Sequence, residues 1–562
     1  MQYDLKIAGG SIIDGTGKAR FAGDVGISAG KVVALGQAPG DAVETIDATG
    51  RVVAPGFVDI HTHYDAQILW DQRLTISPWH GVTTVVMGNC GFGIAPTRQV
   101  DRDRIVRTLE KVEGMSVAAL EAGLGAEWGF ATFPQYLDAV ERKGPAINVA
   151  ALIGHTPVRL FAMGEAATER AATAEEVAAM RGIVRDGLDA GALGFATSKA
   201  ITHVGYGGKP VPSRAAAFSE VLALAGALRE AGKGVIQATI GPGLQFDEFA
   251  ALARESGAHV SWTALLAGRP RQGVDHRVQL ARSLELARQN YAVFPQVTPR
   301  PLNFELQLKE PFVFESMSLF RPISAADFAG KKRLYADADF RKAFRDKMDR
   351  APGEFVLGFR STMISEYAPD PSLEERRLVD VAAERGVHPV DLMLDLGLAT
   401  DLDARFRMAV ANNNEDDVAE LLLDPHMVMG LSDAGAHASQ LCDACQATYL
   451  LGRWVREKQA LSLEQAIRML TSRPAEVFGI ADRGRLAAGW PADIVVFDPA
   501  TVGAGKLRRV WDFPGGANRL VSDASGIDAV IVNGTVLRQN GRDRVAPDGK
   551  LPGKLLRNGR AA

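Results

Sequence analysis

Residues 56–67, GFVDIHTHYDAQ, begin with a short apolar run and continue into two histidines, His61 and His63, that stand two positions apart. The run at 57–63 predicts a buried β-strand. On an extended chain alternate side chains point to the same side, so both imidazoles should face one space at the end of this strand. Two convergent histidines form half of a metal site, and the alternative is a pair of histidines hydrogen-bonded inside the fold.

Further apolar segments follow this strand and alternate with helical patterns, in which apolar residues recur every three or four positions. Such alternation is typical of a parallel sheet whose strands are joined by crossover helices. Eight β/α units of this kind predict an α/β fold, a (β/α)8 TIM-like barrel. The predicted strands are 57–63, 83–90, 147–155, 193–198, 234–240, 258–265, 292–297 and 427–433, and the clearest helices are 175–191, 219–231 and 247–255.

The two ends of the chain have a different pattern, in which short strands are separated by glycine-containing turns. Near the C-terminus, Asn533-Gly534 is a strong signal for a hairpin. We therefore predict one small β-sandwich built from residues 1–54 and 486–562, around a barrel domain at 55–485.

Within the barrel domain, residues 299–405 are rich in Phe, Arg and Lys and lie between the last two predicted strands. A connection of this length is not a simple loop. It predicts a largely helical insertion over the barrel mouth, which serves either as a lid that selects the substrate or only as a packing element.

The composition is that of a globular protein, because 47% of the 562 residues are hydrophobic and 23% are charged. The formal net charge of -4 does not fit the basic surface of a nucleic-acid-binding or polybasic membrane-binding protein. Three cysteines are too few for a disulfide framework and fit a reducing compartment. With neither a secretory signal pattern nor an apolar run of ~20 residues, we expect a cytoplasmic protein. Barrel enzymes of this size often pair, so a homo-oligomer stays open.

Two other strand ends carry reactive side chains, and the strand ends of such a barrel converge on one pocket. Asp433 ends the eighth strand, where it can bind a metal and take a proton from metal-activated water. Cys90 ends the second strand, as either a zinc-binding thiolate or a small buried thiol. His437 follows Asp433 by four residues and could orient it, bind substrate or cap a following helix.

These motifs resemble those of the amidohydrolase superfamily, and within it the D-aminoacylase or N-acyl-D-amino-acid deacylase family. The resemblance implies that zinc and a carboxylate together drive the attack of water on an amide carbonyl. In this sequence the metal-binding roles would fall to His61, His63, Cys90 and Asp433, with Asp433 as general base and acid. The supporting stretches are GFVDIHTHYDAQ (56–67), SPWHGVTTVVMGNCGFGIAP (77–96), GHTPVR (154–159), LSDAGAH (431–437), LTSRPAEVFGIADRGRLAAGWPADIVVFD (470–498) and LPGKLLR (551–557).

The sequence departs from this family at two strand ends. Members usually carry a histidine after the fifth strand, in Thr-His-x-Arg, and another after the sixth, in Ser-His-x-Lys. Here these strands end in QATIG (237–241) and VSWTA (260–264), without either histidine and without the Arg or Lys.

Three interpretations of the metal site remain. The preferred one is a single metal held by His61, His63 and Asp433, with or without Cys90, which leaves an open position for water. In the second, Gln237 adds a weak oxygen ligand or an oxyanion contact. In the third, the lost ligands are replaced by other residues near the strand ends, His155 or His203.

Other polar and aromatic residues near the strand ends are candidates for binding the substrate, although each alone is more often a surface or packing residue. Trp262 stands where the family has a histidine, which predicts an apolar pocket floor and a bulky or aromatic substrate. The full set of candidates is His155, Arg159, Lys199, His203, Tyr206, Gln237, Trp262, Gln296, Arg300 and His437.

We therefore expect a zinc-dependent hydrolase acting on carbon–nitrogen bonds other than peptide bonds, with an N-acyl amino acid or a related small amide as substrate. One ion of zinc, or of another divalent metal, is expected, and neither nucleic acid nor a membrane is expected as a partner. One rival is a cyclic amide or imide hydrolase, whose two metals would need a bridging lysine, for which Lys199 is placed. The other is a non-catalytic binding relative that lost metal ligands, although the retained His61, His63 and Asp433 argue against it.

Overall fold

The structure is a computed structural model that describes residues 2–205, 208–268, 275–311, 314, 317–350 and 359–561. The chain divides into two compact units. The first contains residues 1–265, 280–299 and 422–562, and the second contains residues 266–279 and 300–421. None of the described helices has the length and apolar character that a membrane span requires.

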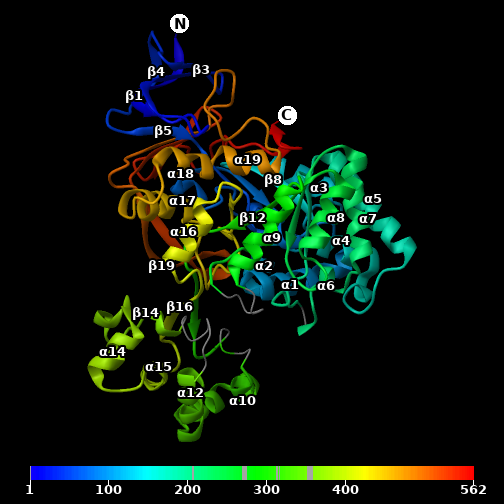
Figure 1. Cartoon of the computed structure of the whole chain (residues 1–562), viewed down its shortest axis with the longest axis vertical. Coiled ribbons are helices and arrows are strands. Elements are labelled where there is room, and N and C mark those ends of the chain that lie inside the picture. Colours follow the sequence, from blue (N-terminus) through cyan, green and yellow to red (C-terminus); the bar gives the residue numbers. More distant parts are fainter. Residues whose placement is uncertain are drawn as a thin grey trace. The chain divides into compact units, whose positions relative to one another are not determined.

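The first unit is built around an eight-stranded parallel sheet that forms a nearly closed barrel, of which Figure 1 labels β8 and β12. A bridge between Thr62 and Ala434 joins the chain just beyond the first strand to the chain just beyond the last. The predicted (β/α)8 barrel is therefore confirmed, and each predicted strand overlaps an observed one. In chain order they are β6 (Phe57–Asp59), β7 (Val82–Met87), β8 (Asn148–Gly154), β9 (Gly194–Ser198), β10 (Val235–Thr239), β11 (His259–Thr263), β12 (Val293–Val297) and β17 (Val428–Met429).

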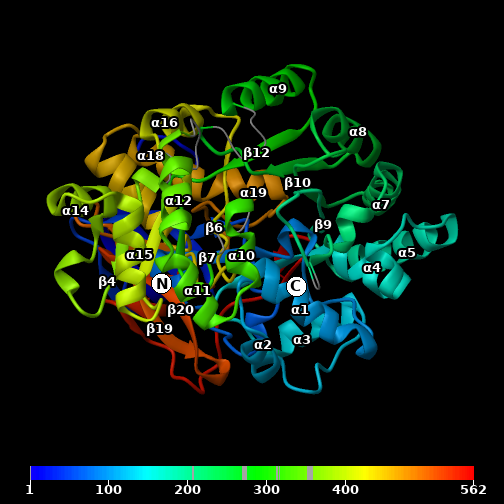
Figure 2. The ribbon, with the colours of Figure 1, turned by 90° about the horizontal axis from the view of Figure 1, so that it is seen from below.

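Helices connect the barrel strands and lie on their outer side, as Figure 2 shows for α4, α5, α7 and α8. Helix α5 begins with a capping box between Thr173 and Glu176 and ends at Gly191, which has a left-handed φ of 116°. The predicted helices correspond to α5, α7 and α8. The bounds are α1 (Arg102–Glu113), α2 (Val117–Leu124), α3 (Phe133–Lys143), α4 (His155–Met163), α5 (Ala174–Ala190), α6 (Pro212–Ala215), α7 (Phe218–Ala231), α8 (Phe246–Ser256), α9 (His276–Arg288), α16 (Glu415–Leu423), α17 (Gln446–Tyr449), α18 (Leu463–Leu470) and α19 (Ser472–Phe478).

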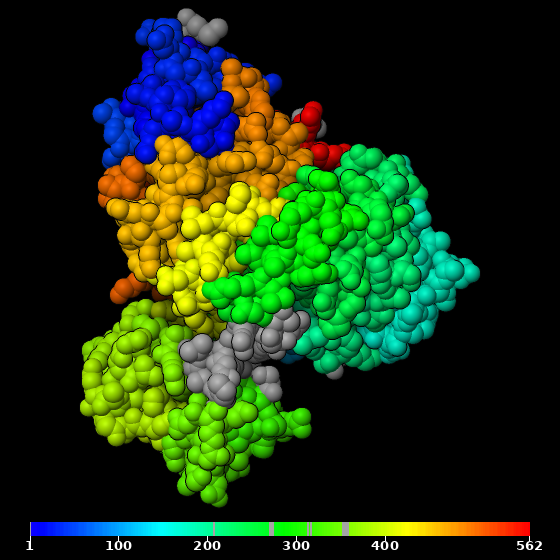
Figure 3. Space-filling view, viewed as in Figure 1, coloured from blue at the N-terminus to red at the C-terminus, as the bar shows by residue number. Residues whose placement is uncertain are grey.

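Both termini contribute to one nine-stranded sheet, as predicted, and their segments adjoin in the space-filling view (Figure 3). Strand β5 from the N-terminal part pairs with β18 from the C-terminal part, and their apolar side chains share one core. A long hairpin of β19 and β20 was not predicted from the sequence. The nine strands of the sheet are β1 (Tyr3–Ile12), β2 (Phe21–Ser28), β3 (Lys31–Gly36), β4 (Ala42–Asp47), β5 (Val52–Pro55), β18 (Ile494–Phe497), β21 (Ile527–Val532), β22 (Thr535–Gln539) and β23 (Arg542–Asp543). Two separate two-stranded sheets are formed by β19 (Gly503–Phe513) with β20 (Ala517–Ser525) and by β24 (Leu556–Arg557) with β25 (Arg560–Ala561).

The second unit has its own apolar core and combines helices with a four-stranded sheet that was not predicted from the sequence. In strand β16 the buried Phe406 and Met408 alternate with the half-buried Arg405 and Arg407, which is a strand pattern. The predicted domain boundaries and the lid role stay predictions. The elements are β13 (Leu302–Gln307), α10 (Arg321–Ala325), α11 (Phe328–Ala336), α12 (Ala338–Arg350), β14 (Met363–Glu366), β15 (Arg376–Arg377), α14 (Leu378–Arg385), α15 (Pro389–Ala399) and β16 (Arg405–Ala411).

Candidate metal centre and active site

The side chains of His61, His63 and Cys90 form a buried cluster just beyond the ends of β6 and β7. Each side chain offers one ligand atom, and the three atoms all lie within 4.8 Å of one another. Cys90 Sγ is 3.5 Å from His61 Nε2, and the two imidazole ring centroids are 5.3 Å apart. Nitrogen and sulfur are the donors that zinc prefers, so the chemistry of this set fits a zinc ion.

A tight turn directs the Cys90 thiol into the cluster. Cys90 has a left-handed φ of 56°, and Gly88 and Gly91 on either side have φ values of 86° and 72°. Gly88 must be a glycine, because a Cβ there would lie 2.2 Å from the carbonyl oxygen of Leu152. Burial acts to raise the pKa of the Cys90 thiol, but the neighbouring His61 lowers it to about 7, which favours the metal-binding thiolate.

Asp433 reaches the same cluster from the opposite end of the sheet, beyond β17. Its Oδ1 lies 3.2 Å from His61 Nε2 and 3.6 Å from His63 Nε2. The chain around it is fixed by Ser432, whose hydroxyl donates to the His61 carbonyl at 3.0 Å. Burial acts to raise the pKa of Asp433, but its contacts with the two imidazoles outweigh burial and lower that pKa. The structure thus brings together all four residues predicted as metal ligands.

Each histidine of the cluster also has a partner that fixes the orientation of its ring. His61 Nδ1 is 2.8 Å from Gln296 Oε1, and His63 Nδ1 is 3.0 Å from Glu113 Oε1. The Gln296 amide is itself oriented, because its Nε2 donates to Ser261 Oγ at 3.0 Å. With Nδ1 engaged in this way, Nε2 of each ring faces the centre of the cluster, as in carboxylate–histidine–zinc arrangements. Gln296, predicted as a substrate-binding residue, is thus used to hold the imidazole of His61.

Glu113 is a functional candidate that the sequence analysis missed. It is 3% exposed and ends helix α1, where it follows Ile105 and Leu109 at four-residue intervals on the buried face. A carboxylate on an apolar helix face is unusual, and a helix C-terminus disfavours negative charge. These two violations were visible in the sequence and could have identified Glu113.

Gln237 uses its side chain to hold the loop that carries Cys90. Its Oε1 accepts a hydrogen bond from the Cys90 N–H at 2.6 Å. This bond engages the oxygen that was predicted to serve as a weak metal ligand or an oxyanion contact. Gln237 therefore positions the Cys90 loop, and its predicted contact with a metal or an oxyanion stays a prediction.

Trp262 does not form the floor of the pocket, so it gives no support to the bulky or aromatic substrate that was predicted from it. Its indole donates to Ser283 Oγ at 3.1 Å and stacks on Phe249 of helix α8. Alternate residues of a strand face opposite sides, so Ser261 and Thr263 face the barrel interior and Trp262 faces the surrounding helices. Trp262 was expected to face the pocket in place of a family histidine, but its side of β11 faces the helices.

His155 and Arg159, also predicted to bind substrate, form a buried network with Glu220. His155 Nε2 is 2.8 Å and Arg159 Nε is 2.7 Å from Glu220 Oε1, and His155 Nδ1 is 2.8 Å from Thr197 Oγ1. Both imidazole nitrogens of His155 are thereby engaged, so His155 does not replace a lost metal ligand. Lys199 is nearby but donates to the backbone carbonyls of Arg214 and Ala216, at the end of α6.

The remaining candidates have mixed outcomes. The ring of His203 packs against Phe92 at 4.9 Å, and burial together with the nearby His437 lowers the pKa of His203 to about 3. His437 does not cap a helix, because α17 begins only at residue 446. Arg300 belongs to the second unit, and Tyr206 lies outside the described residues, so substrate binding by either stays a prediction.

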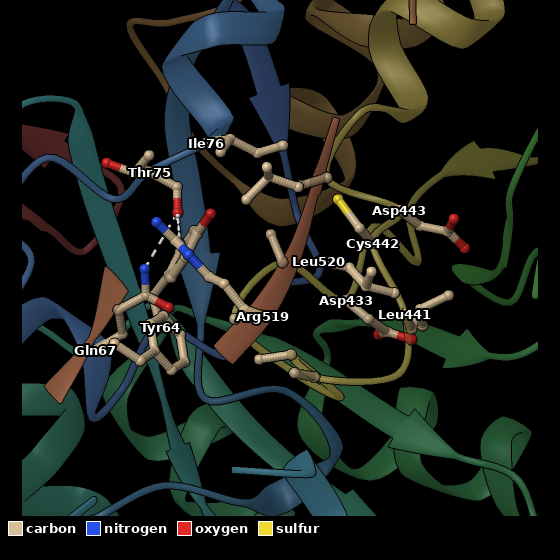
Figure 4. A pocket seen from close by; sticks show the side chains of 17 residues that line it. Tyr64, Gln67, Thr75, Ile76, Asp433, Leu441, Cys442, Asp443, Arg519 and Leu520 are labelled. Atoms are coloured by element: carbon tan, nitrogen blue, oxygen red, sulfur yellow. Dashed lines mark hydrogen bonds between the residues drawn. The ribbon is translucent and has the colours of Figure 1, made fainter. Parts of the chain in front are cut away.

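A small cavity lies on another side of Asp433, with a free volume of about 30 Å³ (Figure 4). There Gln67 Nε2 and Arg519 Nη1 both donate to the carbonyl oxygen of Thr75, at 3.2 and 2.6 Å. The cavity has room for about two water molecules, which is too little for an amide substrate. It is therefore a small space beside Asp433, lined by both polar and apolar side chains, and not the substrate pocket.

Comparison with known proteins gives a match to the model of the amidohydrolase family over residues 44–328 and 334–538. The chain belongs to the amidohydrolase family. This amidohydrolase is 31% identical to the N-acyl-D-glutamate deacylase of Alcaligenes xylosoxydans xylosoxydans over 568 residues, which cover 99% of this chain and 97% of that protein. The resemblance seen in the sequence motifs is thereby confirmed.

Two solved structures resemble this amidohydrolase over almost the whole chain. One is N-acyl-D-glutamate deacylase from Bordetella bronchiseptica complexed with zinc and a phosphonate inhibitor, with a TM-score of 0.67, 28% identity and coverage of 99% of this chain and 100% of that one. The other is D-aminoacylase, described with a binuclear metal centre, one-metal activation and second-metal attenuation; its TM-score is 0.67, at 26% identity and coverage of 98% and 99%.

Proposed function

We propose that this amidohydrolase cleaves the amide bond of an N-acyl amino acid with one zinc ion held by His61, His63 and Cys90. The observation that carries the proposal is the convergence of these three donors with the Asp433 carboxylate, which lies 3.2 Å from His61 Nε2. The relatives that act on N-acyl-D-amino acids support the substrate class. Zinc bound there would act as a Lewis acid toward the amide carbonyl and acidify the attacking water.

Asp433 is the proposed general base and acid of this reaction. Its carboxylate is at the cluster, and its contacts there are the imidazoles of His61 and His63. It would accept a proton from the attacking water and deliver that proton to the leaving nitrogen, so that the amine departs uncharged. Asp433 is also available as a fourth ligand when no water is held.

A single metal is proposed because the fifth and sixth strands offer no further strong ligands. Gln237 and Thr239 face inward from β10, and Ser261 and Thr263 do so from β11. The rival cyclic amide hydrolase would need Lys199 as a bridge between two metals, but the Lys199 ammonium donates to backbone carbonyls of residues 214 and 216. The oriented histidines argue against a non-catalytic relative, since a binding scaffold has no need of them.

The test is an assay of the zinc-loaded full chain with N-acyl-D-amino acids, their L-enantiomers and a hydantoin as a cyclic amide. We expect release of free amino acid from an acyclic substrate, and a loss of about 10²–10⁴ in kcat for Asp433→Asn at unchanged zinc content. Ring opening of the hydantoin alone would favour the cyclic amide hydrolase. No hydrolysis by folded, zinc-loaded protein would favour the binding relative.

A further inference from the structure

A continuous chain of hydrogen bonds runs from the backbone of Cys90 to the end of strand β10. The Cys90 N–H donates to Gln237 Oε1 at 2.6 Å, and Gln237 Nε2 donates to Thr263 Oγ1 at 3.2 Å. The Thr263 hydroxyl in turn donates to Thr239 Oγ1 at 3.2 Å. All of these side chains are buried, and Thr239, at 8%, is the most exposed of the three.

The direction of this chain is fixed at Cys90, because a backbone N–H can only donate. Gln237 must therefore turn its oxygen towards Cys90 and its NH₂ group towards Thr263. The Thr263 hydroxyl accepts that bond and donates its own hydrogen to Thr239 Oγ1. Thr239 accepts in its turn, and among the described residues its own hydroxyl hydrogen has no acceptor.

Thr239 is placed where a substrate would lie. It is the last residue of β10 and shares the inner face of that strand with Gln237, two positions earlier. The C-terminal strand ends of such a barrel form its active-site mouth. A buried hydroxyl group costs free energy when no acceptor is available for its hydrogen. This cost disappears when water or a ligand accepts that hydrogen.

We infer that the Thr239 hydroxyl is a substrate-binding group, which donates a hydrogen bond to an acceptor oxygen of the bound N-acyl amino acid. Gln237 and Thr263 are positioning residues. They make the Thr239 oxygen an acceptor, so that its hydroxyl hydrogen is free to point towards the barrel mouth. The same series of hydrogen bonds holds the backbone of Cys90. The loop that carries this proposed metal ligand and the proposed substrate contact are therefore fixed together. This inference rests on the proposed function.

The decisive experiment compares Thr239→Val with Thr239→Ser in the zinc-loaded full chain. Valine keeps the shape of threonine without its hydroxyl, and serine keeps the hydroxyl. With an N-acyl amino acid that the wild type cleaves, we expect Thr239→Val to lower kcat/KM about tenfold and Thr239→Ser to stay within about threefold of wild type. Zinc content should be equal in all three proteins.

The matched control is Thr84→Val, which makes the same change at a buried threonine of β7 outside the chain of bonds, and it should leave kcat/KM unchanged. A Thr239→Val enzyme within twofold of wild type would overturn the inference. So would a Thr239→Ser enzyme as impaired as the valine variant, since the effect would then be one of packing. A wild type that cleaves no N-acyl amino acid would overturn the proposed function, and this inference with it.

The positioning roles are tested by a double-mutant cycle of Gln237→Leu and Thr239→Val. The loss in kcat/KM caused by Gln237→Leu is first corrected for zinc content. If Gln237 acts through Thr239, the corrected loss should disappear when Thr239→Val is already present. Additive losses would show that Gln237 does not act through Thr239. Zinc content of each variant, measured by elemental analysis, separates this effect from a displaced Cys90.

Discussion

Two groups of side chains in the described part of the chain could hold a metal ion, and they differ in burial. One is the barrel cluster of His61, His63 and Cys90 in the first unit, where all three residues are buried. The other, in the second unit, consists of His276, Asp417 and Glu420. There the side chain of Glu420 is 47% exposed and that of Asp417 is 19% exposed, although His276 is buried.

The two groups also differ in what already balances their charge. In the second unit Arg277 lies 2.6 Å from Asp417 and 2.9 Å from Glu420, so a guanidinium occupies the place of a cation. In the barrel the described side-chain partners of Asp433 and Glu113 are the imidazoles of His61 and His63, the two histidines proposed as metal ligands. The ligand types alone therefore do not distinguish the two groups, whereas the oriented histidines of the barrel and the Arg277 guanidinium of the second unit do.

The largest effect that separates the two clusters should be on zinc content. His61→Ala combined with His63→Ala removes two of three proposed ligands, so zinc should fall from about one per chain to less than about 0.1. The matched control, His276→Ala combined with Glu420→Ala, should keep about one zinc. Elemental analysis of each protein after zinc loading and dialysis is the measurement. Loss of zinc in the control, with retention in the barrel variant, would reverse the comparison.

A smaller effect should come from the partner that orients His61. Gln296→Leu removes the acceptor for His61 Nδ1, which should weaken zinc binding about 10–100-fold. Gln296→Glu keeps an oxygen at that position and should bind zinc at least as tightly as wild type. The measurement is competition with a chelator of known zinc affinity. Equal affinities for the leucine and glutamate variants would show that Gln296 serves only in packing.

The sequence predicted the barrel and the candidate metal ligands because both predictions depend on local patterns. The alternation of a strand predicts that His61 and His63 face one space, and the position of Asp433 at a strand end places it there. The helical and strand periods likewise separate the barrel from the β-rich termini. The second unit was predicted only in part, because its sheet joins strands that lie far apart in sequence, such as β13 and β16.

The residues that surround the ligands could not be assigned in the same way. Gln296 and Gln237 were recognised as near the site, but their roles depend on which atom each amide presents to a distant residue. Glu113 lies on a connecting helix, where strand-end reasoning does not look. Trp262 was misjudged because one position along a strand changes the face, and the resemblance to a family motif does not fix that register.

The smallest effect should come from the second cluster, as a change in stability without any change in zinc content. Glu420→Gln removes the charge that pairs with Arg277, and this pair lowers the pKa of Glu420. Because the folded-state pKa is lowered, the pair stabilises the protein above the unfolded pKa of about 4.5, and this stabilisation is lost as the pH falls through the lowered value. At pH 7 and low salt, Glu420→Gln should lower Tm by about 1 °C or less, since the pair is exposed and screened by water.

Thermal unfolding with and without 1 M salt is the measurement, and the difference in Tm between the variant and the wild type should shrink in salt. A fall in zinc content in this variant would instead make the second cluster a metal site that competes with Arg277.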